Sequence, residues 1–327
     1  MKFARREFLQ LAGAAATTPI LPYSALALDY PTRPVRLIVP FAPAGPTDVF
    51  ARVLAQKLSE RLGKQFYVEN IPGAGGNIGT GRAAQAAPDG YSLLVVGVTY
   101  AINPSLFEKV PYDPYKSFEP IIDAVTNTLV LTVNPSVPAQ TVSELVALVR
   151  ANPGKYSYAS TGTGTVAHLA GELFRLSLGL DLVHVPFNGA GPAITSTLAG
   201  HTPISFTGAT PVVPHALQGT LRALAVTSEA RLPVLPDVPT MAEAGYPDIQ
   251  GENWTVLLTP TGTSTEIIAF LNREIINVLT TPDIRERLTA LGYEPVAAST
   301  PHDSATLIRT EMSKWGKVIR DAGIKAE

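Results

Sequence analysis

The 327-residue chain contains no cysteine. This absence excludes disulfide bonds, cysteine-ligated zinc, iron–sulfur clusters and a thiol nucleophile. An excess of positive charge is also missing, because 25 lysines and arginines stand against 27 acidic residues, for a formal net charge of −2. Such a chain has no basic field for nucleic acid, so we expect no nucleic-acid partner.

The motifs of metal, nucleotide and nucleophilic sites are missing as well. The five histidines, at positions 168, 184, 201, 215 and 302, have neither an H-E-x-x-H motif nor a comparable spacing. A dinucleotide motif beginning at Gly73 would need glycine at position 78, where Ile78 stands. Ser160 does not stand in a G-x-S-x-G motif either. We therefore expect no cofactor and no metal, and we do not expect an enzyme.

The first 27 residues are typical of an export signal. Arg5 and Arg6 open a segment that resembles a twin-arginine motif, and the apolar run over 9–18 is too short to span a membrane. Small residues over 25–27 predict cleavage before Leu28. The mature protein is then expected in the periplasm. An uncleaved anchor is the alternative, whereas a lipoprotein would need a cysteine.

From Val35 onward, short β-branched runs alternate with amphipathic stretches, which predicts an α/β fold with parallel strands. The predicted strands are 35–39, 66–69, 93–96, 129–133, 156–159, 183–186, 204–206, 221–226 and 256–258. The predicted helices are 48–62, 78–87, 142–151, 166–178, 190–199, 265–280, 282–291 and 301–322.

Two segments, 128–135 and 251–260, are candidates for crossings between two lobes. They predict a discontinuous lobe 1 over 28–130 plus 252–327 and a lobe 2 over 131–251. A hinge with two crossings is typical of lobes that close on a ligand. A single larger sheet is the alternative.

The first candidate site follows the predicted strand 35–39, where a Gly/Pro loop leads into a helix. The free N–H groups at a helix N-terminus attract a carboxylate or a phosphate, and the loop has no Lys or Arg to assist them. An ordinary turn is the alternative, in which Asp48 only caps the helix. The candidate ligand-binding residues in this loop are Phe41, Ala42, Ala44, Thr47 and Asp48.

Two further loops have the same form. The glycine-rich run 73–79 precedes a helix and contributes Asn77 as a candidate, with a purely structural loop as the alternative. The segment 158–165 joins a strand to a helix through two glycines and several hydroxyl side chains, which allow close approach of the backbone and hydrogen bonding. For His168, a structural hydrogen bond is favoured over a role as a general base. The candidates in this loop are Ser160, Thr161, Gly162, Gly164, Thr165 and His168.

Taken together, these stretches resemble the Bug family, the extracytoplasmic solute receptors of tripartite tricarboxylate transporters. The resemblance runs through Tyr30-Pro-Thr-Arg-Pro-Val-Arg-Leu-Ile-Val-Pro-Phe41 and His168-Leu-Ala-Gly-Glu-Leu-Phe174. Further segments that carry it are 46–48, 68–79, 87–93, 111–114, 152–155, 183–187, 221–228, 235–240, 243–245 and Trp254.

The resemblance implies a type II periplasmic-binding-protein fold, with two α/β lobes joined by a two-crossing hinge around a ligand cleft. It implies capture of a small carboxylate for integral-membrane transporter subunits, by a protein that we expect to be a monomer. Family members hold the ligand carboxylate through main-chain amides of the loops that match 41–48 and 160–165. A sensory protein that presents its ligand to a histidine kinase, or an enzyme on the same fold, are the alternatives.

Three positions depart from the family pattern. The first loop has Ala44 where the family has glycine, and Asn188 replaces a common lysine. Thr207 stands where an aspartate often follows the phenylalanine of a late strand, and it completes the set of candidate ligand-binding residues. If that aspartate meets a ligand amine, its absence disfavours amino acids and favours an uncharged or purely carboxylate ligand.

Overall fold

The structure is a computed structural model that describes residues 29–43 and 45–325. The predicted export signal, its cleavage before Leu28, and the candidate residue Ala44 lie outside the described residues. The chain from Pro31 onward forms one compact unit.

The described part of the chain contains ten hydrogen-bonded strands. Eight follow one another in the order β2-β1-β3-β9-β4-β7-β5-β6, and β8 and β10 each pair with β4 beside this path. The first strands are β1 (Val35–Val39), β2 (Phe66–Asn70), β3 (Ser92–Gly97), β4 (Phe118–Val133) and β5 (Ser157–Ser160). The others are β6 (Val183–Pro186), β7 (Ile204–Gly208), β8 (Arg222–Val226), β9 (Glu252–Pro260) and β10 (Glu294–Pro295).

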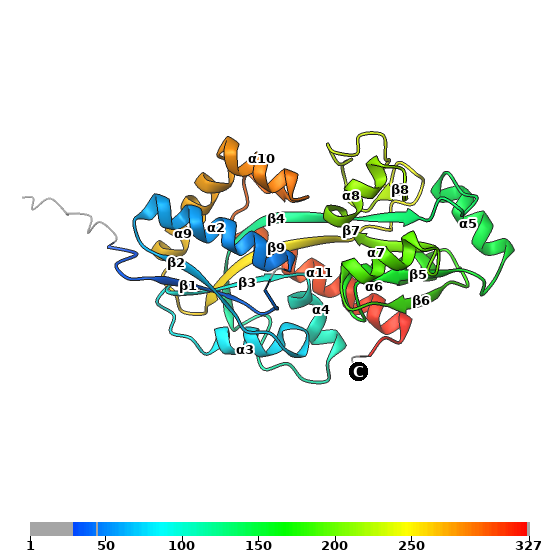
Figure 1. Cartoon of the computed structure of the whole chain (residues 1–327). Helices are drawn as coiled ribbons and strands as arrows, with labels where there is room; N and C mark the ends of the chain where they lie inside the picture. The colour runs from blue at the N-terminus through cyan, green and yellow to red at the C-terminus, as the bar shows by residue number, and fades with distance from the viewer. Residues whose placement is uncertain (1–28, 44, 326–327) are drawn as a thin grey trace, which may run out of the picture. The chain divides into compact units, whose positions relative to one another are not determined.

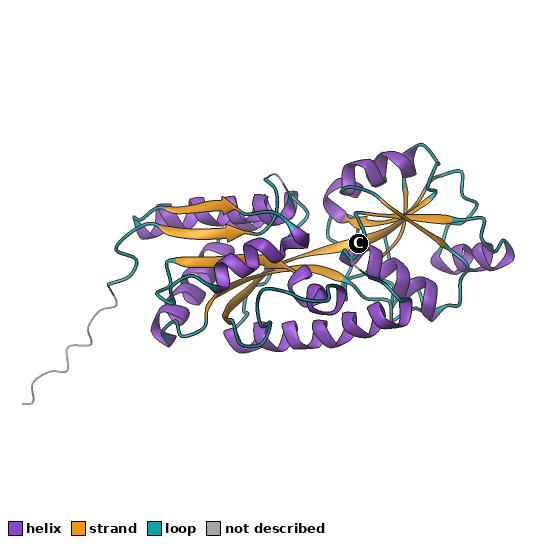
Figure 2. Cartoon of the chain, turned by 90° about the horizontal axis from the view of Figure 1, so that it is seen from below, coloured by secondary structure: helices purple, strands orange, loops and turns teal. Residues whose placement is uncertain are grey.

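The long strand β4 belongs to two sets of strands. Its residues up to Thr128 pair with β9, which continues to the parallel strands β3, β1 and β2. From Leu129 onward it pairs with β7 and β8, and β7 continues to the parallel strands β5 and β6. Figures 1 and 2 show β4 and β9 running between the two sets. The hydrogen bonding is thus continuous, as in a single sheet, while the change of partners at Leu129 separates two lobes.

Helices cover both sets of strands. They are α2 (Pro46–Leu62), α3 (Asn77–Ala84), α4 (Thr99–Leu106), α5 (Val142–Ala151), α6 (Val166–Ser177), α7 (Ala190–Leu198), α8 (Ala209–Leu217), α9 (Thr265–Leu279), α10 (Pro282–Ala290) and α11 (Pro301–Ala322), with the 3-10 turn η1 (Ala74–Gly76). Two of them, α4 and α8, were not expected, because Pro104 and Pro214 interrupt the sequence pattern that marks a helix.

The C-terminal helix α11 joins the two halves of the core. It packs against α4 beside the first set of strands and against α6 beside the second (Figure 1). The Glu311 carboxylate accepts hydrogen bonds from both indole N–H groups of the chain, 3.2 Å from Trp254 and 2.6 Å from Trp315. One hydrophobic cluster therefore extends from β3 through Trp254 and Trp315 to α6.

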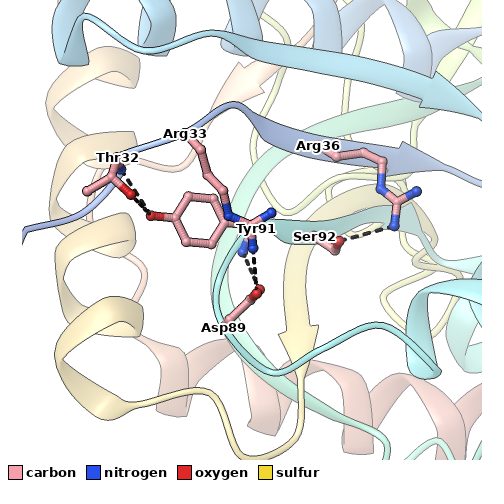
Figure 3. A network of polar contacts seen from close by, with 6 residues as sticks. All are labelled: Thr32, Arg33, Arg36, Asp89, Tyr91 and Ser92. Carbon is pink, nitrogen blue, oxygen red and sulfur yellow. Dashed lines mark hydrogen bonds and ion pairs between the residues drawn. The ribbon is translucent and has the colours of Figure 1, made fainter.

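The start of β1 is tied to the turn before β3 by a surface network (Figure 3). Arg33 forms an ion pair of 2.7 Å with Asp89 and lies over the ring of Tyr91, whose hydroxyl accepts the Thr32 N–H at 3.0 Å. Such exposed pairs add little to the free energy of unfolding, so this network mainly orients the entry into β1.

Candidate ligand-binding site

A cavity of about 550 Å³ lies where β4 passes between the two sets of strands. Its wall is built from 41–43, 45–47 and 97–99 on the first side, from Thr161, 165–167, 188–190, Gly208, Thr210 and Pro211 on the second, and from Asn127, Leu129 and Asn253 on the strands between. The volume fits a small organic ligand.

Helix N-termini dominate this wall. In the described part of the chain, residues in the first turn of each of α2, α4, α6, α7 and α8 line the cavity. Each of these helices directly follows a strand, namely β1, β3, β5, β6 and β7, so the carboxyl ends of the strands open onto one space. None of the described lining residues carries a charge. The positive ends of the helix dipoles and their free N–H groups therefore make the cavity suited to an anion.

The loop before α2 is held by residues from distant parts of the chain. The Tyr293 hydroxyl donates to the Pro46 carbonyl at 2.7 Å, and the Asn70 amide donates to the Phe41 carbonyl at 3.1 Å. Behind the loop, Asp48 is only 2% exposed and accepts hydrogen bonds from Asn70 at 2.8 Å and Arg52 at 2.9 Å. The hydrogen bond to Asp48 raises the pKa of Arg52. Asp48 thus anchors the loop from inside.

The glycine-rich run 73–79 packs against Phe41 of the same loop. Gly76 has a φ of +95°, and a Cβ placed there would lie 3.1 Å from the Phe41 ring. Glycine is therefore required for Phe41 to pack where it does. Asn77 is buried and accepts a hydrogen bond from the Asn103 amide at 2.9 Å, so its side chain is used within the protein.

The loop before α6 is held by its own side chains. Thr165 caps the helix: its hydroxyl accepts the His168 N–H at 3.3 Å and donates to the Gly162 carbonyl at 2.7 Å. Gly164 has a φ of +74°, and a Cβ there would collide with Leu106 of α4. This glycine lets the loop reach α4 across the cavity wall.

Two histidines lie directly behind this loop. The Nδ1 atom of His168 accepts the Gly164 N–H at 3.0 Å, and Nε2 of His184 lies 2.7 Å from the Ser160 hydroxyl. The two imidazole rings are stacked, with centroids 3.8 Å apart and planes 8° apart. Burial lowers the pKa of each histidine to about 4.

The structure brings together five of the residues predicted for ligand contact. Phe41, Ala42, Thr47, Thr161 and Thr165 line the cavity, and contact with a ligand stays a prediction for them. The others are not among the lining residues: Asp48, Asn77, Ser160, Gly162, Gly164, His168 and Thr207.

For these seven residues, contact with a ligand stays a prediction that the described lining does not support. The N–H groups of Gly162 and Gly164 are already used by Ser160 and His168. Thr207 is fully buried beside Val130, and its hydroxyl has no hydrogen-bond partner among the described residues.

The sequence reasoning missed the lining residues of α4, α8 and the strands between. Thr99, Asn127, Thr210 and Asn253 line the cavity although no motif marks them. Asn127 donates to the Thr210 hydroxyl at 3.1 Å and also to the Gly292 carbonyl, so it ties α8 to the turn before β10. The signal that identified the other loops, a glycine between a strand and a helix, is present at Gly97 and Gly208 and would have found both helices.

Within 29–43 and 45–325, no cluster of three or more His, Asp or Glu side chains is arranged to hold a metal ion. No helix in that part of the chain has the length and apolar character to cross a membrane.

Comparisons with known proteins define the class of this fold and site. The family model described as "Tripartite tricarboxylate transporter family receptor" matches residues 50–324. The chain belongs to this family of solute-binding receptors. It is 39% identical over 320 residues to protein BugT of Bordetella pertussis, covering 97% of this chain and 96% of BugT. The resemblance to the Bug family is confirmed.

Solved structures confirm the fold. Rhodopseudomonas palustris Rpa4515, solved with adipate, is 32% identical, with a TM-score of 0.80 over 91% of this chain and 99% of that one. MatC (Rpa3494) from the same organism, solved with bound malate, is 34% identical, with a TM-score of 0.76 over 89% of this chain and 100% of that one. The chain has the α/β periplasmic-binding-protein fold with two lobes.

Proposed function

We propose that the protein is a periplasmic receptor that captures a small mono- or dicarboxylate and delivers it to the membrane subunits of a tripartite tricarboxylate-type transporter. The observation that carries this proposal is the convergence of five helix N-termini on a cavity whose described lining residues are all uncharged. A carboxylate there would be held by backbone N–H groups and hydroxyls, without a cation.

The lining also supports a choice among carboxylates. None of the described lining residues is acidic, so a ligand ammonium group would be desolvated without a partner. Amino acids are therefore disfavoured. Two relatives of the same fold were solved with adipate and with malate, which carry only carboxyl and hydroxyl groups. We expect a ligand of this chemistry, aliphatic or aromatic.

The proposal includes export and lobe organisation. Residues 1–27 act as the signal, with cleavage before Leu28, and N-terminal sequencing of the exported protein tests this. The lobes are 28–130 plus 252–327 and 131–251, and the change of β4 partners at Leu129 supports the first boundary. We propose a monomer without catalytic activity. A pull-down of membrane proteins with ligand present distinguishes a transporter from a histidine kinase as the partner.

A thermal-shift screen of the chain from Leu28 onward tests ligand capture. The panel contains dicarboxylates, benzene and pyridine carboxylates, amino acids and sugars, with native protein beside protein refolded from denaturant to remove any carried-over ligand. A ligand at about 100 times its Kd adds roughly 2.7 kcal/mol to the free energy of unfolding, which raises Tm by several degrees. Shifts for one class of carboxylates are expected. Shifts for amino acids alone, or no shift in the refolded sample, would overturn the proposal.

A further inference from the structure

Behind the loop before α6, His168 is buried and His184 is half-buried, and neither lines the cavity. His168 is 5% exposed and sits one turn into α6, next to the residues of that helix that line the cavity. Among the described residues, the His168 ring has one hydrogen-bond partner: its Nδ1 atom accepts the Gly164 N–H at 3.0 Å. The protonation state of this buried ring therefore affects the loop through the contact with Gly164.

The Gly164 contact determines the tautomer of His168. Because an N–H can only donate, Nδ1 of His168 must carry a lone pair, and the neutral ring then has its proton on Nε2. A protonated ring would carry N–H groups at both nitrogens, so one N–H would face another. The observed geometry is therefore compatible only with neutral His168.

The surroundings of His168 keep it neutral. On α6, the Glu172 carboxylate faces His168, but Arg175 holds it at 2.6 Å. On β5, the Tyr158 hydroxyl donates to the same carboxylate at 2.8 Å. On β6, the His184 ring lies flat against His168 at 3.8 Å, so a charge on one ring opposes a charge on the other. The negative charge of Glu172 is thus compensated, and burial disfavours the imidazolium.

We propose that neutral His168 is a positioning residue for ligand binding, which holds Gly164 in its left-handed conformation and thereby orients the N-terminus of α6 toward the cavity. This inference rests on the proposed capture of a carboxylate. Gly164 connects the lining residues Thr161 and Thr165, and it packs against Leu106 of α4. A loop released from His168 would keep its hydroxyl groups but lose the alignment of its N–H groups with the anion.

The first test uses the ligand-free protein from Leu28 onward. Nuclear magnetic resonance of uniformly ¹⁵N-labelled protein reports the imidazole nitrogens and the Gly164 amide between pH 7.5 and 3.5, with His168 and His184 assigned from single variants. We expect the Nε2–H tautomer of His168 at pH 7.5, no protonation around pH 6.5, and a Gly164 amide that shifts together with His168. An Nδ1–H tautomer, or a Gly164 amide whose chemical shift does not change when His168 is protonated, would overturn the proposal.

The second test measures the affinity for adipate and for malate by calorimetry at pH 7.5. His168→Asn places an amide oxygen close to the position of Nδ1 and can accept the Gly164 N–H, whereas His168→Leu cannot. We expect about a tenfold loss of affinity in His168→Leu, which corresponds to one lost hydrogen bond, and recovery of most of it in His168→Asn. His201→Asn, on an exposed histidine, is the matched control and should bind as the parent does.

The two tests separate the two proposals. If the unaltered protein binds neither acid, the expected ligand chemistry fails, and the resonance experiment alone decides whether His168 positions Gly164. If the protein binds but His168→Leu binds equally well at an unchanged Tm, the positioning role is wrong while the proposed function stands.

Discussion

The loop before α2 and the loop before α6 both connect a buried strand to a helix N-terminus at the cavity, yet they are fixed in different ways. The first has no side-chain cap on its helix and begins it with Pro46. It depends on Asn70 and on Tyr293, which is 247 residues away along the chain. The second is capped by its own Thr165 and braced by His168 in the same helix.

The two loops represent two ways of positioning backbone N–H groups for an anion when the described cavity wall has no cation. In the first loop, the buried carboxylate of Asp48 lies behind the backbone and forms an ion pair with the half-exposed Arg52. In the second, the groups behind the backbone are two neutral histidines. A change in the first loop should therefore act through tertiary contacts and charge, while a change in the second should act through local backbone geometry and pH.

The largest effect is expected from Thr161→Pro in the second loop. The substitution removes the N–H of a residue that lines the cavity and restricts the backbone there. We expect loss of measurable carboxylate binding with the fold intact, read by calorimetry and circular dichroism. Thr161→Ala keeps the N–H and removes only the hydroxyl, so it should retain most of the affinity. Equal affinities for the proline variant and the parent would contradict the main-chain site.

A smaller effect is expected from Asp48→Ala in the first loop. Asn70 and Arg52 lose their shared acceptor, and because Arg52 is half exposed, the cost is about 2 kcal/mol in the free energy of unfolding. Denaturant titration measures it. Asp48→Asn retains the shape and one acceptor oxygen and should cost less. If both variants are as stable as the parent, Asp48 does not anchor this loop.

A further test is the pH dependence of stability. The pKa of His168 and His184 is about 4 in the folded protein, against an ordinary value of 6.5. The unfolded chain therefore binds more protons than the folded one, and the histidine contribution to the free energy of unfolding falls as pH drops from about 6.5 to about 4. Each unit of difference in pKa is worth about 1.4 kcal/mol.

Partly buried carboxyl groups act in the opposite direction, and the two with the larger shifts in pKa, Asp123 and Glu252, must be removed to see this. Burial raises the pKa of Asp123 and of Glu252 to about 7, so their contribution rises as pH falls from about 7. In an Asp123→Asn, Glu252→Gln background, Tm should fall between pH 7 and 5, and adding His168→Asn should flatten the fall. A fall of the same size with and without His168 would assign it to other groups.

The smallest effect is expected from Tyr293→Phe, which removes the hydroxyl that donates to the Pro46 carbonyl. Tyr293 is 4% exposed, and one buried hydrogen bond is worth about 1 kcal/mol. We expect a loss of that size in the free energy of unfolding and a few-fold loss of affinity, because the start of α2 is less constrained. Tyr115→Phe, on an exposed tyrosine, should leave both quantities unchanged.

Much of the lobe architecture followed from local patterns. The alternation of β-branched runs and amphipathic stretches indicated the strands of both parallel groups and most of the helices that cover them. The pattern was wrong for β4, predicted over 129–133 and observed over Phe118–Val133. Pro120 and Asp123 break the apolar alternation there, and pairing with β9 and β10 imposes the strand conformation nonetheless.

The sequence by itself determined the family, the α/β class and the two uncharged loops before α2 and α6. The loops could be predicted because glycine, proline and hydroxyl residues at a strand end act through local backbone geometry. Only the tertiary structure decided that five helix N-termini share one cavity and that Asp48, Asn77 and His168 stand behind its wall. Strand order sets which ends lie together, and the burial of a side chain depends on what packs against it from far along the chain. Neither the strand order nor the burial of a side chain is encoded in the spacing of neighbouring residues.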